Sequence, residues 1–293
     1  MDIENSKVSV IIPTLNAEKE LPTLLKALYS QKRIIDELII VDSASTDRTV
    51  DICKENEAIH LIQIERKDFD HGRTRDMALR KSVGDIVVFM TQDAVPANDD
   101  FLGNLIAPLA DEKVAVSTGR QLPKEDATLA EQLIRTFNYP AESHIRSKED
   151  IPRMGIKTFF CSDVCAVYNR EIYLELGGFE YPLKTNEDMF YAAKAINAGY
   201  RVAYAADAMV YHSHNFTLKQ QYQRNYIQGY ELERNKELLR NVSKEKEGTK
   251  LVRFVSKNLI RKFRIISVFQ FGFDCCARYL GSIVGKKDSK KTS

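Results

Sequence analysis

Short apolar strands alternate with amphipathic helices over residues 7–90, and this alternation constrains the fold more than any other feature of the chain. Apolar, β-branched runs indicate buried strands at Lys7–Pro13, Glu37–Val41, His60–Glu65 and Asp85–Met90. Apolar residues at helical spacing indicate intervening helices at residues 18–31, Arg48–Asn56 and Thr74–Ser82. This order predicts right-handed βαβ crossovers and a Rossmann-like α/β fold, with a mostly parallel sheet and helices on both faces.

The pattern is looser from residue 97 onward. We expect helices at Leu102–Leu109, Leu129–Tyr139, Arg170–Leu176 and Glu187–Ala198. Further strands are expected at Val114–Thr118, Phe159–Tyr168, Arg201–Ala205 and Met209–Tyr211. Beyond Leu218 the chain should be helical, with a charged hinge at Lys244–Lys250. We therefore predict a catalytic domain at residues 1–230 and a basic, amphipathic helical extension at residues 231–293.

Charge is distributed unevenly along the chain. Residues 240–293 carry 14 Lys and Arg against four Asp and Glu, a local charge of +10, whereas the whole chain carries +2. Residues 1–239 are therefore acidic, at −8. A basic tail on an acidic body favours an anionic surface as the partner of the tail. Nucleic acid is not expected as a partner, because the basic stretch contains no recognised binding module.

Cysteine usage and the N-terminus indicate the compartment. The five cysteines lack zinc-type pairing, so we expect buried, reduced thiols. The N-terminal stretch has no basic segment followed by an apolar core and cleavage site, so no secretory signal is expected. Both observations favour the cytoplasm.

Polar side chains follow three of the predicted strands. Thr14 and Asn16 come after the first strand, Asp42 after the second, and Gln92 and Asp93 after the fourth. Open parallel sheets bind ligands beyond the carboxyl ends of their strands, where these loops converge. The sequence therefore predicts a pocket that contains two acids.

An ordered set of motifs resembles a known family. The set comprises SVIIPTLN, VDSASTDRT, DFDHGRTRD (68–76), TQDAVP (91–96), NEDMFYAAKAINAGY (186–200) and VYHSHN (210–215). Over roughly residues 7–230 it resembles the GT-A fold of family 2 glycosyltransferases, and within them the bacterial rhamnosyltransferase branch. The resemblance implies transfer of L-rhamnose from dTDP-L-rhamnose to a hydroxyl of a glycan or lipid-linked saccharide, in cell-surface polysaccharide synthesis.

The chain departs from the Asp-x-Asp signature of that family. The corresponding residues are Thr91, Gln92 and Asp93, so only the second acid is present. This departure leaves two alternatives open: a non-catalytic, nucleotide-binding relative, and a glycosyltransferase that uses another nucleotide sugar.

The resemblance also assigns nucleotide-binding residues. Asp42 would bind the base, with the first-strand residues beside it; the full predicted set is Pro13, Thr14, Asn16, Asp42, Arg75, Gln92 and Asp93. A carboxylate that accepts the ring N–H of uracil or thymine selects a pyrimidine. The alternatives are that Asp42 caps the following helix, and that Arg75 forms a surface ion pair with Asp76 or Asp70.

Asp93 is the strongest metal candidate, because Mn²⁺ or Mg²⁺ would stabilise the departing diphosphate. Such ions take only one or two protein carboxylates, so a single Asp suffices. The resemblance adds His212 or His214 as a second ligand, and spacing of two along a strand would place both on one face. Imidazole favours Mn²⁺ over Mg²⁺. The alternative is a surface His pair without a metal.

Asp188 is the candidate catalytic base. An acceptor hydroxyl needs a group that takes its proton as the new bond forms, and the resemblance assigns this role to Asp188. Glu187 and Gly178 are expected near the acceptor, and Arg224 near the diphosphate. No positioned nucleophile is evident, so we expect direct displacement with inversion.

The basic tail has two interpretations. In the first, Phe263, Ile266, Phe269 and Phe273 enter an anionic membrane surface at the cytoplasmic face. In the second, the same residues pack against the body or a second subunit of a homodimer. We favour the membrane, because a lipid-linked acceptor would be located there.

Overall fold

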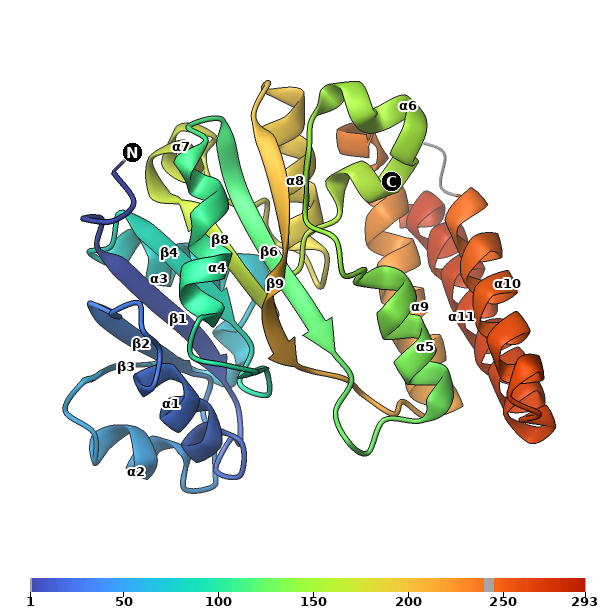
Figure 1. The fold of residues 1–293 in the computed structure, drawn as a ribbon, viewed down its shortest axis with the longest axis horizontal. Helices are drawn as coiled ribbons and strands as arrows, with labels where there is room; N and C mark the ends of the chain where they lie inside the picture. Colours follow the sequence, from blue (N-terminus) through green and yellow to red (C-terminus); the bar gives the residue numbers. More distant parts are fainter. Residues whose placement is uncertain (1, 240–244, 293) are drawn as a thin grey trace.

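The computed structural model describes residues 2–239 and 245–292 (Figure 1). The described strands are β1 Val8–Thr14, β2 Glu37–Asp42, β3 Ile59–Gln63, β4 Ile86–Met90, β5 Val95–Pro96, β6 Val114–Leu122, β7 His144–Arg146, β8 Cys165–Asn169 and β9 Arg201–Tyr211. The described α-helices are α1 Leu21–Tyr29, α2 Thr49–Lys54, α3 His71–Lys81, α4 Phe101–Ile106, α5 Leu129–Asn138, α6 Ile151–Met154, α7 Arg170–Glu175, α8 Glu187–Asn197, α9 Leu218–Arg234, α10 Glu245–Arg261 and α11 Ile265–Thr292.

The strands form one nine-stranded sheet in the order β3-β2-β1-β4-β8-β6-β9-β5, with β7 paired to β9. The first four positions in this order are occupied by parallel strands, as predicted, so Pro13 and Thr14 lie opposite Val41 and Asp42. Strand β8 runs antiparallel to both β4 and β6, whereas β9 is parallel to β6. The α/β prediction is confirmed, with a sheet that is mixed because β5, β7 and β8 run against their neighbours.

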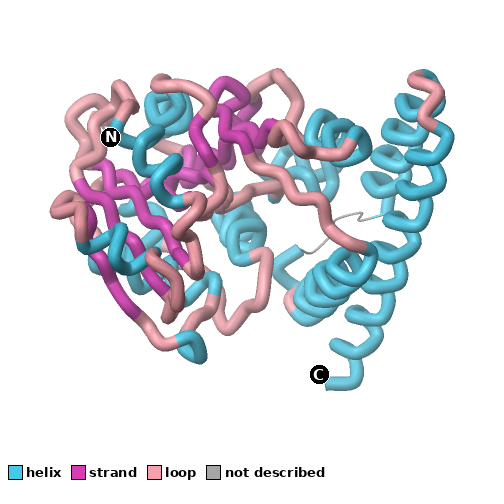
Figure 2. The backbone as a smooth tube through the Cα atoms, turned by 90° about the horizontal axis from the view of Figure 1, so that it is seen from below, coloured by secondary structure: helices cyan, strands magenta, loops and turns pink. Residues whose placement is uncertain are grey.

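Both faces of the sheet are covered by helices (Figure 2). Val10 and Ile12 point to a core shared with α1 and α4, whereas Ile11 points to a core shared with α3 and α8. Strands buried on both faces are continuously apolar, which explains why the first strands were evident from sequence.

Two strand predictions need correction. Residues 159–164 of the predicted strand at 159–168 do not join the sheet, because Ser162 and Asp163 hydrogen-bond to side chains instead of a strand ladder. The two short strands predicted at 201–205 and 209–211 form one strand, β9, since a register shift at Gly119/Arg120 accommodates the residues between them.

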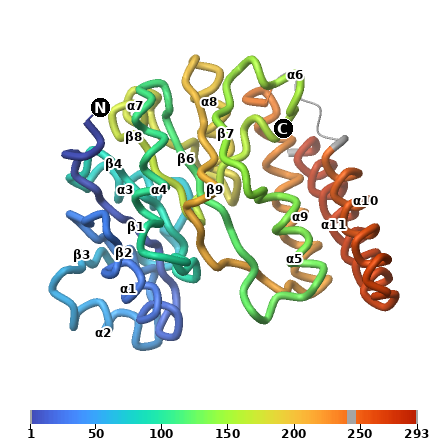
Figure 3. The backbone as a smooth tube through the Cα atoms, in the orientation of Figure 1, coloured from blue at the N-terminus to red at the C-terminus, as the bar shows by residue number. Residues whose placement is uncertain are grey.

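The C-terminal helices pack together at one end of the molecule (Figure 3). The predicted hinge at 244–250 is wrong over Glu245–Lys250, which begin α10, where Glu247 pairs with Lys157 and Lys250; Lys244 lies outside the described residues. No helix among the described residues is long and apolar enough to cross a bilayer. The division at residue 230 stays a prediction; that residue lies within α9.

Candidate active site

The ends of β1, β2 and β4 meet at the carboxyl edge of the sheet, as the strand pattern predicted. Asp42 is fully buried, and its carboxylate accepts hydrogen bonds from Thr14 Oγ1 (3.2 Å) and Ser45 N (3.0 Å). Asp42 does not cap α2; the Thr49 amide is bound by Asp47 (3.0 Å). The capping alternative is therefore wrong, and binding of a nucleotide base by Asp42 stays a prediction.

Amide side chains fix the loops around this edge. Gln92 Oε1 accepts from Leu15 N (2.8 Å), and Gln92 Nε2 donates to Leu15 O (3.2 Å). Asn16 adopts a positive φ of 50° and accepts from Thr46 N (2.9 Å) through Oδ1. These contacts join the predicted nucleotide-binding residues of β1, β2 and β4 into one local structure.

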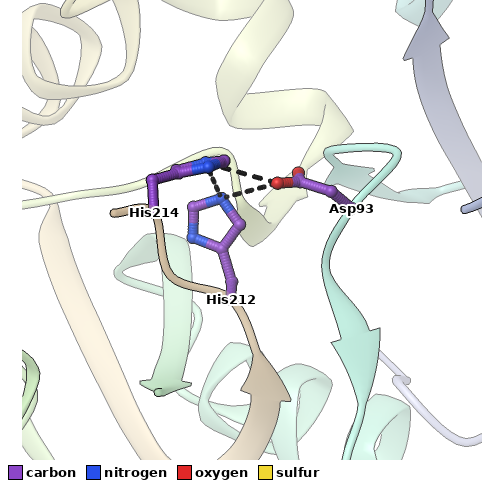
Figure 4. A group of neighbouring side chains, drawn as sticks. All are labelled: Asp93, His212 and His214. Atoms are coloured by element: carbon purple, nitrogen blue, oxygen red, sulfur yellow. Dashed lines mark hydrogen bonds and ion pairs between the residues drawn. The ribbon is translucent and has the colours of Figure 1, made fainter. Parts of the chain in front are cut away.

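Asp93, His212 and His214 form one group of candidate metal ligands, the metal cluster, at the same edge (Figure 4). Oδ2 of Asp93 lies 3.4 Å from His212 Nε2 and 3.3 Å from His214 Nε2. The two Nε2 atoms are 3.1 Å apart. The histidines follow β9 and Asp93 follows β4, so strands distant in sequence supply the three groups.

The charge states of this cluster fit a divalent cation. Burial acts to raise the pKa of Asp93, but the neighbouring imidazoles of His212 and His214 together outweigh burial and hold this pKa below its ordinary value. Burial lowers the pKa of His212, and lowers the pKa of His214 to about 4. A carboxylate and two neutral imidazoles are the protonation states that metal binding requires.

A second layer of side chains orients His212. Its Nδ1 lies 2.9 Å from Gln121 Oε1, so an Nδ1–H tautomer leaves the Nε2 lone pair facing Asp93. Arg135 also donates to Gln121 Oε1, which keeps that oxygen an acceptor. Gln121 Nε2 donates to Ser162 Oγ (2.9 Å). Ligand histidines in metal sites commonly have such a partner on the other ring nitrogen.

Asp188, at the start of α8, is partly exposed. Its carboxylate accepts from Asp163 N (3.1 Å) and Met189 N (2.7 Å). Burial, with the charges of Glu187 and Asp163, raises the pKa of Asp188. A raised pKa makes the carboxylate a stronger proton acceptor.

Arg75 lies among the acids beside Asp188. Only 4% exposed, it has Nη1 3.2 Å from Glu187 Oε1 and Nε 3.5 Å from Asp163 Oδ2. The surface-pair alternative is wrong, because Asp76 pairs with Arg80 and Asp70 caps α3. Nucleotide contact by Arg75 stays a prediction.

The loop at residues 161–164 connects Asp93, the acid of the metal cluster, to Asp188, the candidate base. Thr91 N, two residues before Asp93, donates to Val164 O (3.2 Å), and the adjacent Asp163 N binds Asp188. Asp93 and Asp188 therefore share one edge of the sheet. Sequence reasoning missed Gln121, Arg135, Ser162 and Asp163, because 159–168 was interpreted as a strand and neither Gln121 nor Arg135 belongs to a motif.

The remaining predicted residues have distinct surroundings. Gly178 is buried with a positive φ of 76°, and a Cβ there would lie 2.3 Å from Asp76 Oδ1, so a larger residue does not fit. The Arg224 guanidinium lies 5.3 Å from the ring of Phe216, which itself lies 5.0 Å from the ring of His214. Arg224 is thus on the side of the metal cluster, whereas Gly178 supports the packing of α3.

A pocket of about 720 Å³ lies at the opposite edge of the sheet, near Asp85, Glu112 and Tyr200. These residues precede β4, β6 and β9. Ligands of open α/β sheets bind at the carboxyl edge, which is the edge where Asp93, His212 and His214 lie.

Comparison with known proteins gives a consistent result. The model of the family described as glycosyl transferase family 2 matches residues 9–177. The chain is 43% identical over 224 residues to the O-antigen chain rhamnosyltransferase RfbN of Salmonella typhimurium, covering 76% of this chain and 71% of the relative. It is 42% identical to WbaN, an O-antigen chain rhamnosyltransferase of Salmonella anatum, over 75% and 70% of the two chains.

Solved structures show the same fold. A mannosyltransferase from Pyrobaculum calidifontis, in complex with GDP-Man and Mn²⁺, superposes with a TM-score of 0.61 at 20% identity, covering 95% of this chain and 74% of that one. TarS 1–349 from S. aureus, in complex with UDP-GlcNAc, gives a TM-score of 0.56 at 20% identity, over 86% and 72%.

Proposed function

The chain belongs to glycosyl transferase family 2, and from this premise we propose that it transfers L-rhamnose from dTDP-L-rhamnose to a saccharide hydroxyl in cell-surface polysaccharide synthesis. The relatives named O-antigen chain rhamnosyltransferases, at 42–43% identity, support the sugar and the pathway class. The observation that carries the chemistry is the shared edge of Asp93, His212, His214 and Asp188.

The nucleotide half of the donor would lie along the ends of β1, β2 and β4. Asp42, once released from Ser45, offers a carboxylate acceptor for the ring N–H of thymine. Asn16 and Gln92 hold the flanking loops in place. Pro13 and Thr14 form the floor beside Asp42.

Asp93, His212 and His214 would hold a divalent cation, which neutralises charge on the departing diphosphate when bound. Two nitrogen ligands favour Mn²⁺ over Mg²⁺. Two cationic side chains lie nearby. Lys124 Nζ is 3.8 Å from Asp93 Oδ2. The Arg224 guanidinium lies over the ring of Phe216, and that ring lies beside the ring of His214. Both could contact diphosphate oxygens.

Asp188 would remove the acceptor proton. The acceptor oxygen forms a bond to the anomeric carbon as the bond from that carbon to the diphosphate breaks, and the nucleotide leaves with the electron pair. The proton passes to the Asp188 carboxylate, which the amides of Asp163 and Met189 hold in place. One displacement at one carbon inverts its configuration.

Substitution separates the two roles. We expect Asp188→Asn to lower kcat about 10²- to 10⁴-fold while dTDP binds with Mn²⁺ as in wild type. Asp93→Ala should instead weaken Mn²⁺-dependent dTDP binding. The exposed Asp207→Asn serves as a matched control. Near wild-type transfer by Asp188→Asn would show that the base assignment is wrong, and binding of another nucleotide in preference to dTDP would redirect the donor.

The C-terminal helices α10 and α11 support a proposal for the working location. We place the protein at the cytoplasmic face of an anionic membrane, where a lipid-linked acceptor would be presented. Exposed apolar residues line one face of α11, namely Ile266, Phe269, Phe273, Leu280 and Ile283. Arg261, Lys262 and Arg264 precede this face, and Lys286 and Lys287 follow it.

This charge distribution disfavours the homodimer alternative. In a twofold interface both copies use the same surface. Because basic residues flank the exposed apolar face at both ends, parallel and antiparallel pairing would each bring cations together. An anionic surface instead attracts both ends while the apolar face is buried.

A further inference from the structure

A groove of about 400 Å³ lies between α5, α9 and α11, and His214 of the metal cluster lines it. Its other lining residues include Glu131, Phe216, Gln221, Gln270, Asp274 and Arg278. The groove involves the C-terminal helices, which lie outside the family-model match. Figure 3 shows α5 beside these helices.

Gln221 is the most informative residue of this groove. It is only 4% exposed, and its side-chain amide has no hydrogen-bond partner among the described residues. An amide that faces a groove and has no protein partner can donate and accept hydrogen bonds with a polar ligand there.

The charges of the groove indicate the class of ligand. Glu131 Oε1 is paired with Arg135 Nε at 2.7 Å, and Asp274 Oδ2 with Arg278 Nε at 2.6 Å. Each acid is thus balanced by a cation, which leaves little net positive charge to hold a phosphate or carboxylate. The remaining carboxylate oxygens accept hydrogen bonds, and amides both donate and accept, so together they match sugar hydroxyls.

Phe216 adds an apolar surface to this polar lining. Phe216 lines the groove, and its ring lies beside the ring of His214. Aromatic rings offer broad contact to the C–H face of a sugar at low conformational cost. The groove next to the metal cluster thus combines amides, paired carboxylates and an aromatic residue. These groups are suited to bind a neutral saccharide.

We propose that this groove binds the neutral saccharide of the acceptor, beyond the ring that carries the attacking hydroxyl. The inference rests on the proposed transferase function. It makes the C-terminal helices part of the substrate site, with one side of α11 lining the groove and the exposed apolar face directed away from it.

Saturation-transfer NMR on the full chain tests this proposal, with L-rhamnose, D-galactose and D-mannose as neutral probes and D-glucuronate as an anionic probe. A single ring held by a few hydrogen bonds should bind with a Kd on the order of 1 mM. We expect at least one neutral sugar to bind and glucuronate not to bind. Absence of binding by all three neutral sugars, or preference for glucuronate, would overturn the inference.

Variants locate the binding. Gln221→Leu should weaken sugar binding about tenfold, and Ser267→Phe should block the groove. The matched controls are Gln223→Leu on α9 and Cys276→Phe on α11, both exposed and outside the groove lining. Sugar signals that survive both groove variants but disappear in Asp93→Ala would assign the sugar to the donor site and sink the proposal.

A separate measurement keeps the two proposals distinguishable. Mn²⁺-dependent dTDP binding should be the same in Gln221→Leu and wild type. If the wild type binds a neutral sugar but does not bind dTDP, the donor assignment alone is wrong. If dTDP binds normally and both groove variants bind the sugar as wild type does, the proposal for the groove alone is wrong.

Discussion

At the residue scale, Gln121 controls which nitrogen of His212 faces the metal cluster. Its Oε1 accepts from Arg135 and lies 2.9 Å from His212 Nδ1. Without that acceptor the imidazole can rotate or change tautomer, and Nε2 no longer presents a fixed lone pair. The side chain is 2% exposed and belongs to no recognised motif.

We expect Gln121→Ala to weaken Mn²⁺ binding about 10- to 100-fold, as the loss of an outer partner does in other metal sites. Titration calorimetry with Mn²⁺ alone measures this without any turnover. The control is Gln132→Ala, which removes from α5 an amide whose Nε2 donates to Ala127 O. Equal Mn²⁺ affinity in the two variants would remove Gln121 from the site.

The imidazoles also explain why a single carboxylate can suffice in the metal cluster. The family signature would place a second carboxylate at Thr91, but His212 and His214 bring two further donor atoms to Asp93. A site with one carboxylate and two neutral imidazoles carries less negative charge. We therefore expect the softer Mn²⁺ to bind this site more tightly than Mg²⁺.

At the element scale, α9 and α11 approach so closely that only glycine fits between them. A Cβ on Gly285 would lie 2.0 Å from Tyr226 O, and one on Gly281 would lie 2.3 Å from Tyr222 O. The atoms met are backbone carbonyl oxygens, which cannot move without shifting the helix. The glycines therefore set the distance between the two helices.

Gly285→Ala should lower the free energy of unfolding by roughly 1–3 kcal/mol through overpacking. Gly272→Ala on the same helix meets nothing within 4 Å, so it should raise stability by roughly 0.5–1 kcal/mol through helix propensity. Urea unfolding followed by circular dichroism compares them. If both substitutions raise, or both lower, the free energy of unfolding, the described packing of α11 on α9 is wrong.

The exposed face of α11 gives a second prediction at this scale. Phe269 and Phe273 are 67% and 64% exposed, so replacing them removes no packing from the core. The double variant Phe269→Ser/Phe273→Ser should bind phosphatidylglycerol vesicles about tenfold or more weakly, because it removes apolar area that would enter the interface.

Co-sedimentation with vesicles, with phosphatidylcholine as the uncharged comparison, measures this binding. Wild type should prefer the anionic vesicles, and the preference should decrease with salt. Tyr29→Ser, exposed on α1, is a control outside this face. A wild-type dimer in solution that the double variant dissociates would instead assign the face to a second copy.

At the scale of the whole molecule, the metal cluster joins two halves of the sheet. Asp93 follows β4 on the side of the nucleotide strands, whereas His212 and His214 follow β9, which lies three strands away in the sheet order. A cation held by both halves binds only the folded chain. Metal binding and global stability are therefore coupled.

Mn²⁺ at 100 times its Kd should stabilise the wild-type fold by about 2.7 kcal/mol, seen as a higher Tm. Excess EDTA should reverse the shift. Asp93→Ala should show little shift, whereas Asp207→Asn should behave as wild type. An equal Mn²⁺-induced shift in Asp93→Ala would place the ion elsewhere.

The sequence by itself determined the parallel strands β1–β4, because strands buried on both faces must be apolar and must end in polar loops at one edge. It also determined the ordered motifs, and with them the family and the candidates Asp93 and Asp188. These features are local: a few consecutive residues carry each of them.

Only the tertiary structure decided how Arg75, Asp163 and Gln121 are used. Arg75, whose contact with the nucleotide stays a prediction, is buried between Glu187 and Asp163. Gln121 meets His212 across 91 positions of sequence. Such contacts depend on how β6, β8 and β9 are paired, and pairing across a mixed sheet leaves no periodic trace in the chain.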